Sequence, residues 1–341
     1  MCQSSVWCTR EGDRADGKTR ALNQADAAIV VAGEALVELV LEPSGRTRSR
    51  LGGGGFNAAR TLGRLGLRPL FIARLATDRY GLALRAALRD SGVRLDGIVA
   101  SDDPTTFARV EMATNGTAGY RFYLDGTALA GLRVRDARSL MPADVAVLHV
   151  GGLGLVVDPH AEAVASLVRE TGPETIVALD LNCHPDAIRD PLGYRARLVG
   201  ILRRADVVKA SEADLGYLEP DRLPFQAARR LLEAGPSVVL LTQGPQGATV
   251  LTAEGEARIR PTQARVIDRI GAGDAFGAAW LAAWLSDGRG RGELGSLAAA
   301  TEAARFASRV AALTCERAGA DPPNAVRVGA EWCLAPARSG V

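Results

Sequence analysis

The sequence predicts an α/β fold with a doubly wound, mostly parallel sheet flanked by helices. Short apolar runs of strand length alternate with segments of helical pattern along most of the chain, which is typical of parallel sheets. Polar residues follow several of these runs, at the strand ends where such sheets bind ligands. No internal repeat or low-complexity linker divides the chain, so we expect one domain over residues 26–330.

The composition narrows the classes of function. The 341-residue chain is 47% hydrophobic and 23% charged, which supports a sizeable core. Its 41 basic and 39 acidic side chains nearly balance, so we expect neither nucleic acid nor a membrane surface as a partner. No apolar run is long enough to cross a bilayer. The five cysteines lack Cys-x-x-Cys pairing, which is typical of reduced thiols in a cytoplasmic protein.

The two ends of the chain are expected to lie outside the fold. Residues 1–25 are polar, mix both charge signs and lack the apolar segment of a secretory signal. We therefore expect a disordered extension there and a short tail over 331–341.

The first part of the chain starts with a continuous apolar run that predicts a buried strand over 27–31, ending at Gly33-Glu34. The chain continues extended to Leu41 and carries one acid there, Glu38. The polar, basic residues 42–50 predict a loop or an exposed ribbon. The following elements are a helix over 58–65, a strand over 70–75, a helix over 80–89, and strands over 105–113 and 119–124 joined by a turn at Asn115-Gly116.

The rest of the chain alternates regularly between strands and helices. Strands are expected over 145–150, 175–179, 205–209 and 237–242, with helices over 160–170, 194–204 and 225–233 between them. A short hairpin, 248–251 with 257–259, and helices over 274–285 and 294–313 complete the core. The strand ends carry Asn182, Lys209 and Gln243-Gly244.

The chemistry is expected around the string DRIGAGDAF, from Asp268 to Phe276, at the start of an apolar helix. The first N–H groups of a helix have no internal partner, and the helix dipole adds positive charge, so Gly271–Gly273 predict an anion site. The acid Asp274 beside that site suits a hydroxyl that loses a proton while a phosphoryl group arrives. A glycine turn with an acidic helix cap explains the string equally well.

A second glycine stretch, Gly52–Gly55, approximates a dinucleotide-binding pattern. The residues before it are polar, whereas that pattern requires a hydrophobic strand, so the Rossmann interpretation fails. No P-loop string occurs either. The glycines allow close approach of backbone to a small ligand, and Asn57 offers donors and acceptors to hydroxyls. The alternative is a glycine turn with Asn57 as a helix cap.

Two strings resemble the signatures of one family. GGGGFNAARTLGRLG, from Gly52 to Gly66, is similar to the N-terminal signature of ribokinase-like (PfkB) sugar kinases, and DRIGAGDAF is similar to their C-terminal signature. Both lie in the family's order, near the two ends of the core. The segments 122–128, 180–182, 208–211 and 313–323 look most like fructokinase-type members.

The resemblance implies transfer of the γ-phosphoryl group of ATP to a terminal hydroxyl of a sugar. Asp274 would be the general base, and the N–H groups of Gly271, Ala272 and Gly273 would stabilise phosphoryl charge. The sugar would be bound by Glu38, Gly53, Gly54, Asn57, Tyr123 and Asn182. ATP would be bound by Lys209, Ser211, Thr242, Gly244, Gly247, Gly273 and Ala320.

The resemblance also implies metal ions. Mg²⁺ would bridge the ATP phosphates, with Asp214 organising its water shell. Locally, Ser211-Glu-Ala-Asp214 fits a helix cap with acids in the first turn equally well. Asp268 would help to hold a monovalent cation such as K⁺, as in some family members, and the sequence leaves open whether this chain uses one.

The chain departs from the family at several positions, and three of them bear on the sugar. Glu38 replaces an Asp that binds sugar hydroxyls, and His184 and Leu124 replace arginines that bind the carboxylate of sugar acids in some members. These losses favour a neutral, fructose-like sugar. A sugar-phosphate kinase using Arg109 or Arg121, a nucleoside kinase, a 2-keto-3-deoxy sugar-acid kinase and a non-catalytic sensor remain alternatives.

The family's sheet-like lid is expected from about 41–51 and 105–124. It would cover the sugar and exclude water. In many relatives the lid also pairs subunits, so a homodimer through this lid is expected.

Overall fold

The computed structural model describes residues 27–41, 45–112 and 118–329. Its larger sheet has, in the described residues, nine strands in the order β13-β12-β11-β10-β9-β8-β1-β4-β5. The strands are β1 (Ala28–Ala32), β4 (Leu70–Ala76), β5 (Ile98–Ser101), β8 (Val145–Gly151), β9 (Ile176–Asp180), β10 (Val207–Ser211), β11 (Val238–Thr242), β12 (Ala248–Thr252) and β13 (Gly255–Ile259). All neighbours from β11 to β5 pair parallel, and β12 and β13 pair antiparallel.

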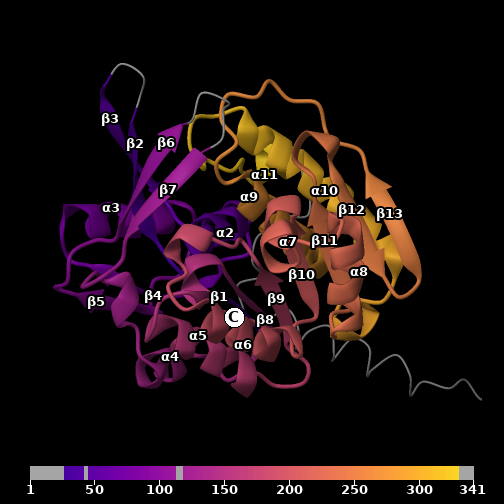
Figure 1. Cartoon of the computed structure of the whole chain (residues 1–341), viewed down its shortest axis with the longest axis horizontal. Coiled ribbons are helices and arrows are strands. Elements are labelled where there is room, and N and C mark those ends of the chain that lie inside the picture. The colour runs from indigo at the N-terminus through magenta and orange to yellow at the C-terminus, as the bar shows by residue number, and fades with distance from the viewer. Residues whose placement is uncertain (1–26, 42–44, 113–117, 330–341) are drawn as a thin grey trace, which may run out of the picture.

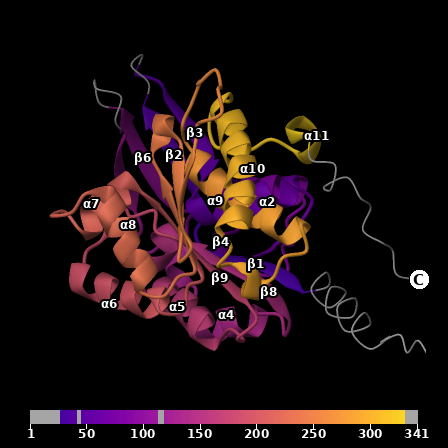
Figure 2. The same ribbon diagram turned by 90° about the vertical axis from the view of Figure 1, so that its right-hand side faces the viewer.

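Helices cover both faces of this sheet (Figure 2). One layer contains α2 (Gly54–Arg64), α3 (Arg79–Asp90), α9 (Ala272–Ser286) and α10 (Leu297–Cys315). The other contains α4 (Val134–Leu140), α5 (His160–Glu170), α6 (Pro191–Leu202), α7 (Glu212–Leu218) and α8 (Pro224–Glu233). The short α11 (Ala325–Val328) packs Val328 against the first layer. The predicted doubly wound α/β fold is therefore confirmed.

The continuous apolar runs of the strands follow from this double coverage. In β1, Val31 packs into the core under α9 while Val30 packs into the core under α5, and both are fully buried. In β10, Val207 and Val208 divide in the same way. Since neither face of these inner strands meets water, they do not alternate between polar and apolar residues, whereas the edge strand β13 does.

Helix α9 is apolar on every side and lies at the centre of its layer. It packs against α10 and α2, and its side chains from Asp274 to Trp284 are buried. Trp280 and Trp284 stack with their ring centroids 5.1 Å apart, and Trp280 Nε1 donates to the Ala300 carbonyl at 3.0 Å. This packing fixes the position of Asp274 in the first turn.

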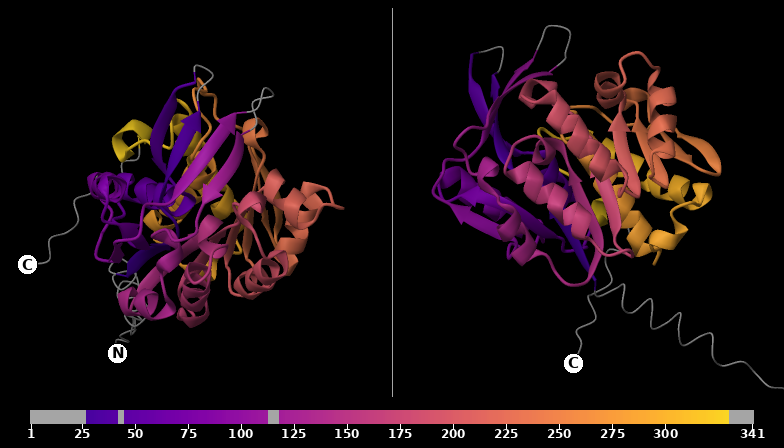
Figure 3. Two further views of the ribbon diagram at one scale, coloured as in Figure 1. Left: turned by 60° about the vertical axis from the view of Figure 1, so that its left-hand side comes forward. Right: turned by 60° about the horizontal axis from the view of Figure 1, so that its bottom comes forward.

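A smaller sheet stands at one side of the larger one (Figures 1 and 3). Its order is β3-β2-β6-β7, where β2 and β6 pair parallel and the outer pairs are antiparallel. The strands are β2 (Leu36–Leu41), β3 (Thr47–Gly52), β6 (Phe107–Met112) and β7 (Ala118–Tyr123). This sheet corresponds to the predicted lid and is called the lid below. The turn at Asn115-Gly116 lies outside the described residues.

Several elements differ from the sequence prediction. The exposed ribbon predicted over 42–50 contains β3, which pairs with β2 along its whole length. Helix α2 begins at Gly54, four residues before its predicted start, because the glycines form its first turn rather than a loop. The short β5, α4 and α7 were missed because their patterns are too short to show a period. None of the helices in the described part of the chain has the length and apolar character that a membrane crossing needs.

Candidate active site

The N-terminus of α9 forms an open cradle of backbone N–H groups. Gly271 caps the helix with φ 78°, a conformation that favours glycine, and a Cβ there would lie 2.4 Å from the Ala320 Cβ. The N–H of Ala272 donates to the Arg269 carbonyl at 3.3 Å. Within the described residues, the N–H groups of Gly273 and Asp274 have no acceptor. These groups can therefore receive an anion.

Asp274 lies at this cradle and is buried. Its Oδ2 accepts a hydrogen bond from Asn57 Nδ2 at 2.8 Å, across 217 residues of sequence. Burial raises the pKa of Asp274, while Lys209 and the Asn57 hydrogen bond oppose the shift. The other amide atom, Asn57 Oδ1, is buried and has no partner among the described residues. The structure thus brings the acid of one signature to the amide of the other.

The N-terminus of α2 is closed by a carboxylate that the sequence prediction did not include. Glu34 Oε1 accepts from Gly54 N at 2.6 Å, and its Oε2 accepts from Gly154 N at 3.0 Å. Burial raises the pKa of Glu34 to about 7, although the hydrogen bonds from these N–H groups lower it. A single local clue existed, since Glu34 follows a buried strand after one glycine. Glu34 thus joins Gly54, which lies near Asp274, to the glycine loop at Gly154.

Gly54 marks where the sugar-side residues meet. A Cβ on Gly54 would lie 3.0 Å from Glu34 Oε1, 3.1 Å from Asn182 Nδ2 and 3.5 Å from Asp274 Oδ1. Asn182 reaches this point from the end of β9 with φ 33°. Gly53, with φ 107°, has no room for a side chain because a Cβ would lie 2.9 Å from the Glu34 carbonyl oxygen. The predicted Gly54, Asn57, Asn182 and Asp274 therefore come together.

Glu38 faces the same side from β2. A Cβ on Gly52 would lie 3.0 Å from Glu38 Oε1, and Glu38 is opposite Arg50 in the lid. Burial and the charge of Asp274 raise the pKa of Glu38 to about 7, and Arg50 acts in the opposite direction. The acid predicted for sugar hydroxyls therefore lies at the inner face of the lid.

Tyr123 is not brought to this group. Successive side chains of β7 point to opposite faces of the lid. Phe122 is opposite Ala108, which is opposite Glu38, so Phe122 and Glu38 share one face. Tyr123 is opposite Phe107, which is opposite Val37, so Tyr123 lies on the other face. Tyr123 is 48% exposed. On the inner face, Tyr120 and Phe122 stack at 5.7 Å and both contact the His184 ring. Tyr120 is thus the tyrosine that faces the site.

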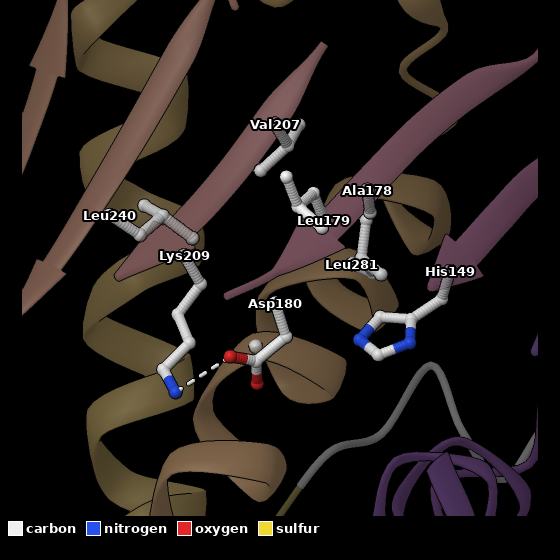
Figure 4. Close-up of a pocket in the computed structure, with 9 residues that line it drawn as sticks. His149, Ala178, Leu179, Asp180, Val207, Lys209, Leu240 and Leu281 are labelled. Carbon is white, nitrogen blue, oxygen red and sulfur yellow. Dashed lines mark hydrogen bonds and ion pairs between the residues drawn. The ribbon is translucent and has the colours of Figure 1, made fainter. Parts of the chain in front are cut away.

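Lys209 lies beside the cradle at the start of α9. Its Nζ donates to Asp180 Oδ1 at 2.9 Å in a buried ion pair, and a Cβ on Gly273 would lie 3.1 Å from the same Nζ (Figure 4). Burial alone lowers the pKa of Lys209, but Asp180, Asp214 and Asp274 outweigh it and raise the pKa. The lysine is therefore charged next to the anion site.

The other predicted nucleotide residues lie along the neighbouring strand ends. Ser211 and Thr242 are opposite each other in β10 and β11. Gly244 has φ 54°, and a Cβ there would meet no atom within 4 Å, so this turn is open. Gly247 has φ 94°, and a Cβ there would lie 2.1 Å from the Ile259 carbonyl oxygen. The packing of the hairpin already requires a glycine at position 247.

Asp214 is engaged by its own helix start. Its Oδ2 accepts from the Ser211 N–H and hydroxyl at 2.7 Å each, forming a capping box, and its Oδ1 accepts from Cys183 N at 2.7 Å. The described residues contain no group of three His, Cys, Asp or Glu side chains that could hold a metal ion. These contacts fit an ion that arrives with a nucleotide better than one held by the chain.

Asp268 is also engaged. Its Oδ2 accepts from Arg50 Nη1 and from Gly319 N at 2.9 Å, and its Oδ1 accepts from Ile270 N at 3.1 Å. A bound cation needs oxygen atoms that are free to coordinate it. A guanidinium and two backbone N–H groups already occupy the oxygens of Asp268, so these residues do not fit a monovalent ion.

Comparison with known proteins decides the family. The profile described as pfkB family carbohydrate kinase matches residues 26–326. The chain belongs to this family. Among other pfkB kinases, it is similar to the fructokinase of Rhizobium leguminosarum bv. trifolii, with 31% identity over 265 residues that cover 76% of this chain and 80% of that protein.

Solved structures of fructokinases share the fold. The structure of fructokinase with bound ATP from Xylella fastidiosa matches with a TM-score of 0.77 and 26% identity, over 86% of this chain and 93% of that one. A fructokinase double mutant from Vibrio cholerae O395, in fructose, ADP and potassium ion bound form, matches with a TM-score of 0.78 and 23% identity, over 89% and 97%. The ribokinase-like fold and the enzyme class, a carbohydrate kinase, are confirmed.

In this pfkB kinase, further residues tie the segment 313–323 to α2. Arg60 Nη1 donates to the Ala320 carbonyl at 2.8 Å, and Arg64 Nη1 donates to Asp321 Oδ1 at 2.6 Å. Arg64 also donates to the Pro322 carbonyl. The predicted Ala320 therefore lies against Gly271, held by an arginine that the sequence prediction did not include.

Proposed function

We propose that this carbohydrate kinase transfers the γ-phosphoryl group of ATP to a terminal hydroxyl of a neutral, fructose-like sugar. The arrangement that carries the proposal is the buried carboxylate of Asp274, bonded to Asn57, directly after the open N–H group of Gly273. Phosphoryl transfer depends on positioning and charge stabilisation, and this arrangement supplies both.

In the proposed reaction, Asp274 accepts the proton of the attacking hydroxyl. The N–H groups of Gly271 and Gly273 and the charged Lys209 stabilise charge on the transferred group, while the Ala272 N–H already donates to the Arg269 carbonyl at 3.3 Å. A raised pKa makes the carboxylate of Asp274 a stronger base than a free aspartate. The orphan Asn57 Oδ1 accepts a hydrogen bond from a sugar hydroxyl.

The surroundings of the sugar side support a neutral substrate. Burial lowers the pKa of His184 to about 4, so the ring is uncharged at pH 7, and Leu124 is buried among apolar side chains. Glu34 and Glu38 face the same region. A sugar acid or sugar phosphate would meet these acids. Arg121, which was an alternative ligand for a sugar phosphate, lies on the outer face of the lid, the same face as Tyr123.

The nucleotide is proposed to lie along the strand ends at Ser211, Thr242 and Gly244, with its phosphates near Lys209 and Gly273. Mg²⁺ would enter with ATP and offset phosphate charge. Asp214 would act by holding the Ser211 turn, because its oxygens accept hydrogen bonds from Ser211 and Cys183.

Release of ADP over a panel of acceptors tests the function. The panel contains neutral sugars, sugar acids, sugar phosphates and nucleosides, each with MgATP. We expect turnover on fructose-like sugars to exceed turnover on the charged acceptors. Turnover on none of them, with ATP still bound, would contradict the kinase proposal and favour a sugar or nucleotide sensor.

A homodimer through the lid and a cytoplasmic location complete the proposal. The outer face of the lid carries Leu41 and Tyr123, which are 36% and 48% exposed. The exposed apolar side chains of Leu41 and Tyr123 would be covered in a dimer through this face. Cys183 and Cys315 are free thiols, which suits a reducing compartment. A monomer at micromolar concentration in sedimentation velocity would exclude the dimer.

A further inference from the structure

Arg50 connects the lid to the loop that precedes the phosphoryl site. It lies on β3, and its Nη1 donates to the Oδ2 of Asp268, three residues before Gly271. The side chains of Arg50 and Asp268 are only 26% and 15% exposed. Partial shielding from water strengthens the attraction between opposite charges. The pair therefore fastens a strand of the lid to the cradle of α9.

The carboxylate of Asp268 has little capacity left for another ligand. A carboxylate offers about four acceptor positions, and Arg50, Gly319 and Ile270 take three of them. A Cβ on Gly319 would lie 3.5 Å from the Arg50 Cδ, so the arginine stem also packs against that loop. A cation at this carboxylate would have to displace Arg50 or lie next to its positive charge.

We propose that the Arg50 guanidinium supplies the positive charge that the resemblance assigns to a monovalent cation at Asp268, so that this kinase needs no K⁺ for turnover. The inference rests on the kinase function proposed above. The guanidinium neutralises Asp268, which otherwise places a negative charge beside the incoming phosphate. A fixed positive charge on strand β3 of the lid thereby takes the place of a diffusible ion.

Arg50 also acts on a second acid, Glu38. The two residues are opposite each other in the register of β2 and β3, and the charge of Arg50 lowers the pKa of Glu38 while its guanidinium is bonded to Asp268. Arg50 contacts neither reacting group in the proposed reaction. It is therefore a positioning residue, which acts through Asp268 and Glu38.

The first arm of the test measures ADP release in K⁺ and in tetramethylammonium at equal ionic strength. We expect wild-type turnover to agree within about twofold between the two cations. Arg50→Gln should lose roughly tenfold or more in tetramethylammonium and regain part of it in K⁺, because the vacated carboxylate can then bind the ion. Arg50→Lys should stay independent of K⁺. Arg94→Gln, which breaks an exposed arginine–aspartate pair far from the site, should behave like wild type.

The second arm measures thermal unfolding without substrates, in the same two salts. An ion that binds the native state raises the melting temperature by mass action. We expect no difference between the salts for wild type and a K⁺-specific rise for Arg50→Gln. Any one of three results would overturn the inference. The first is activation of wild-type turnover by K⁺ of roughly tenfold or more, and the second is a K⁺-specific rise in the wild-type melting temperature. The third is an Arg50→Gln variant that is as active as wild type in tetramethylammonium. Absence of turnover on every acceptor would contradict only the kinase proposal. Thermal unfolding would still report whether an ion binds at Arg50 and Asp268.

Discussion

Two helices of this kinase begin in glycine stretches beside the same site. They differ in whether the first N–H groups of the helix have an acceptor. At the start of α2, Gly54 donates to the carboxylate of Glu34 at 2.6 Å. At the start of α9, Gly273 finds no acceptor within the described residues. The first turn of a helix attracts an anion. The chain supplies that anion at α2, and at α9 the place is open to a substrate.

The contrast shows that a glycine string does not by itself identify a phosphate site. The deciding feature is whether the fold brings a carboxylate of its own to the helix start. Glu34 reaches α2 because β1 ends directly below it, whereas the acid at α9, Asp274, belongs to the helix and is held by Asn57. The closed start borders the proposed sugar site, and the open start borders the proposed phosphoryl site.

The largest effect is expected at the open start. Asp274→Asn should lower turnover at least ~10²-fold with ATP affinity little changed, because the base is lost and the N–H groups remain. ADP release and nucleotide binding measure the two quantities. Asp287→Asn, an exposed acid just after the other end of α9, is the control and should keep wild-type turnover. Retained activity in Asp274→Asn would remove this residue as the base.

A methyl group at Gly271 should clash with Ala320 and disturb the open N-terminus of α9. The Cβ would lie 2.4 Å from the Ala320 Cβ, and φ 78° is unfavourable for alanine. We expect Gly271→Ala to lower turnover by roughly tenfold and the free energy of unfolding by about 1–3 kcal/mol. Gly277→Ala, in the same helix where a Cβ meets nothing within 4 Å, should raise stability by up to about 1 kcal/mol. Equal effects of the two variants would refute the steric argument.

Opening the closed start should cost stability. Glu34→Ala leaves the buried N–H groups of Gly54 and Gly154 without their acceptor, and we expect a loss of about 3 kcal/mol in chemical denaturation. Glu302→Ala, whose side chain is 67% exposed on α10, should change stability by less than about 0.5 kcal/mol. A Glu34 variant as stable as wild type would mean that water replaces the carboxylate at α2.

The smallest effect concerns pH at the loop before α2, where Glu38 lies against Gly52. Its pKa of about 7 in the folded state exceeds the ordinary 4.5, so the folded state binds more protons between these values. The stability that protonated Glu38 contributes is present below pH 4.5 and is lost as the pH rises through 7. Glu38→Gln should remove about 1–3 kcal/mol of this dependence. Identical pH profiles of the unfolding free energy for the two proteins would exclude the shift.

The fold and the centre of the site were predictable because local patterns carry them. Buried strands read as apolar runs, and Asn57 and Asp274 stand in strings that fix both the helix start and the polar residue. Their contact at 2.8 Å joins two such strings. The prediction of Tyr123 failed because the sequence shows that β7 alternates but not which of its faces pairs with Glu38. That choice depends on the register of three strands.

Contacts between distant segments account for the other residues that were missed. Glu34 obtains its role from Gly154, 120 residues away, and Arg50 from Asp268, 218 residues away. In the sequence, Arg50 is one of several arginines in a polar segment and nothing distinguishes it. Long-range pairing of this kind follows from the assembled sheet and lid, and no local period reports it.

The stacked indoles of Trp280 and Trp284 give this enzyme an optical label on helix α9. Near-ultraviolet circular dichroism and emission depend on how two such rings overlap. The chain has four tryptophans, and the other two, Trp7 and Trp332, lie outside the described residues. Replacing those two by phenylalanine would leave tryptophan emission that comes from α9 alone. Any displacement of this helix when a nucleotide arrives at its first turn could then be followed in real time without an added dye.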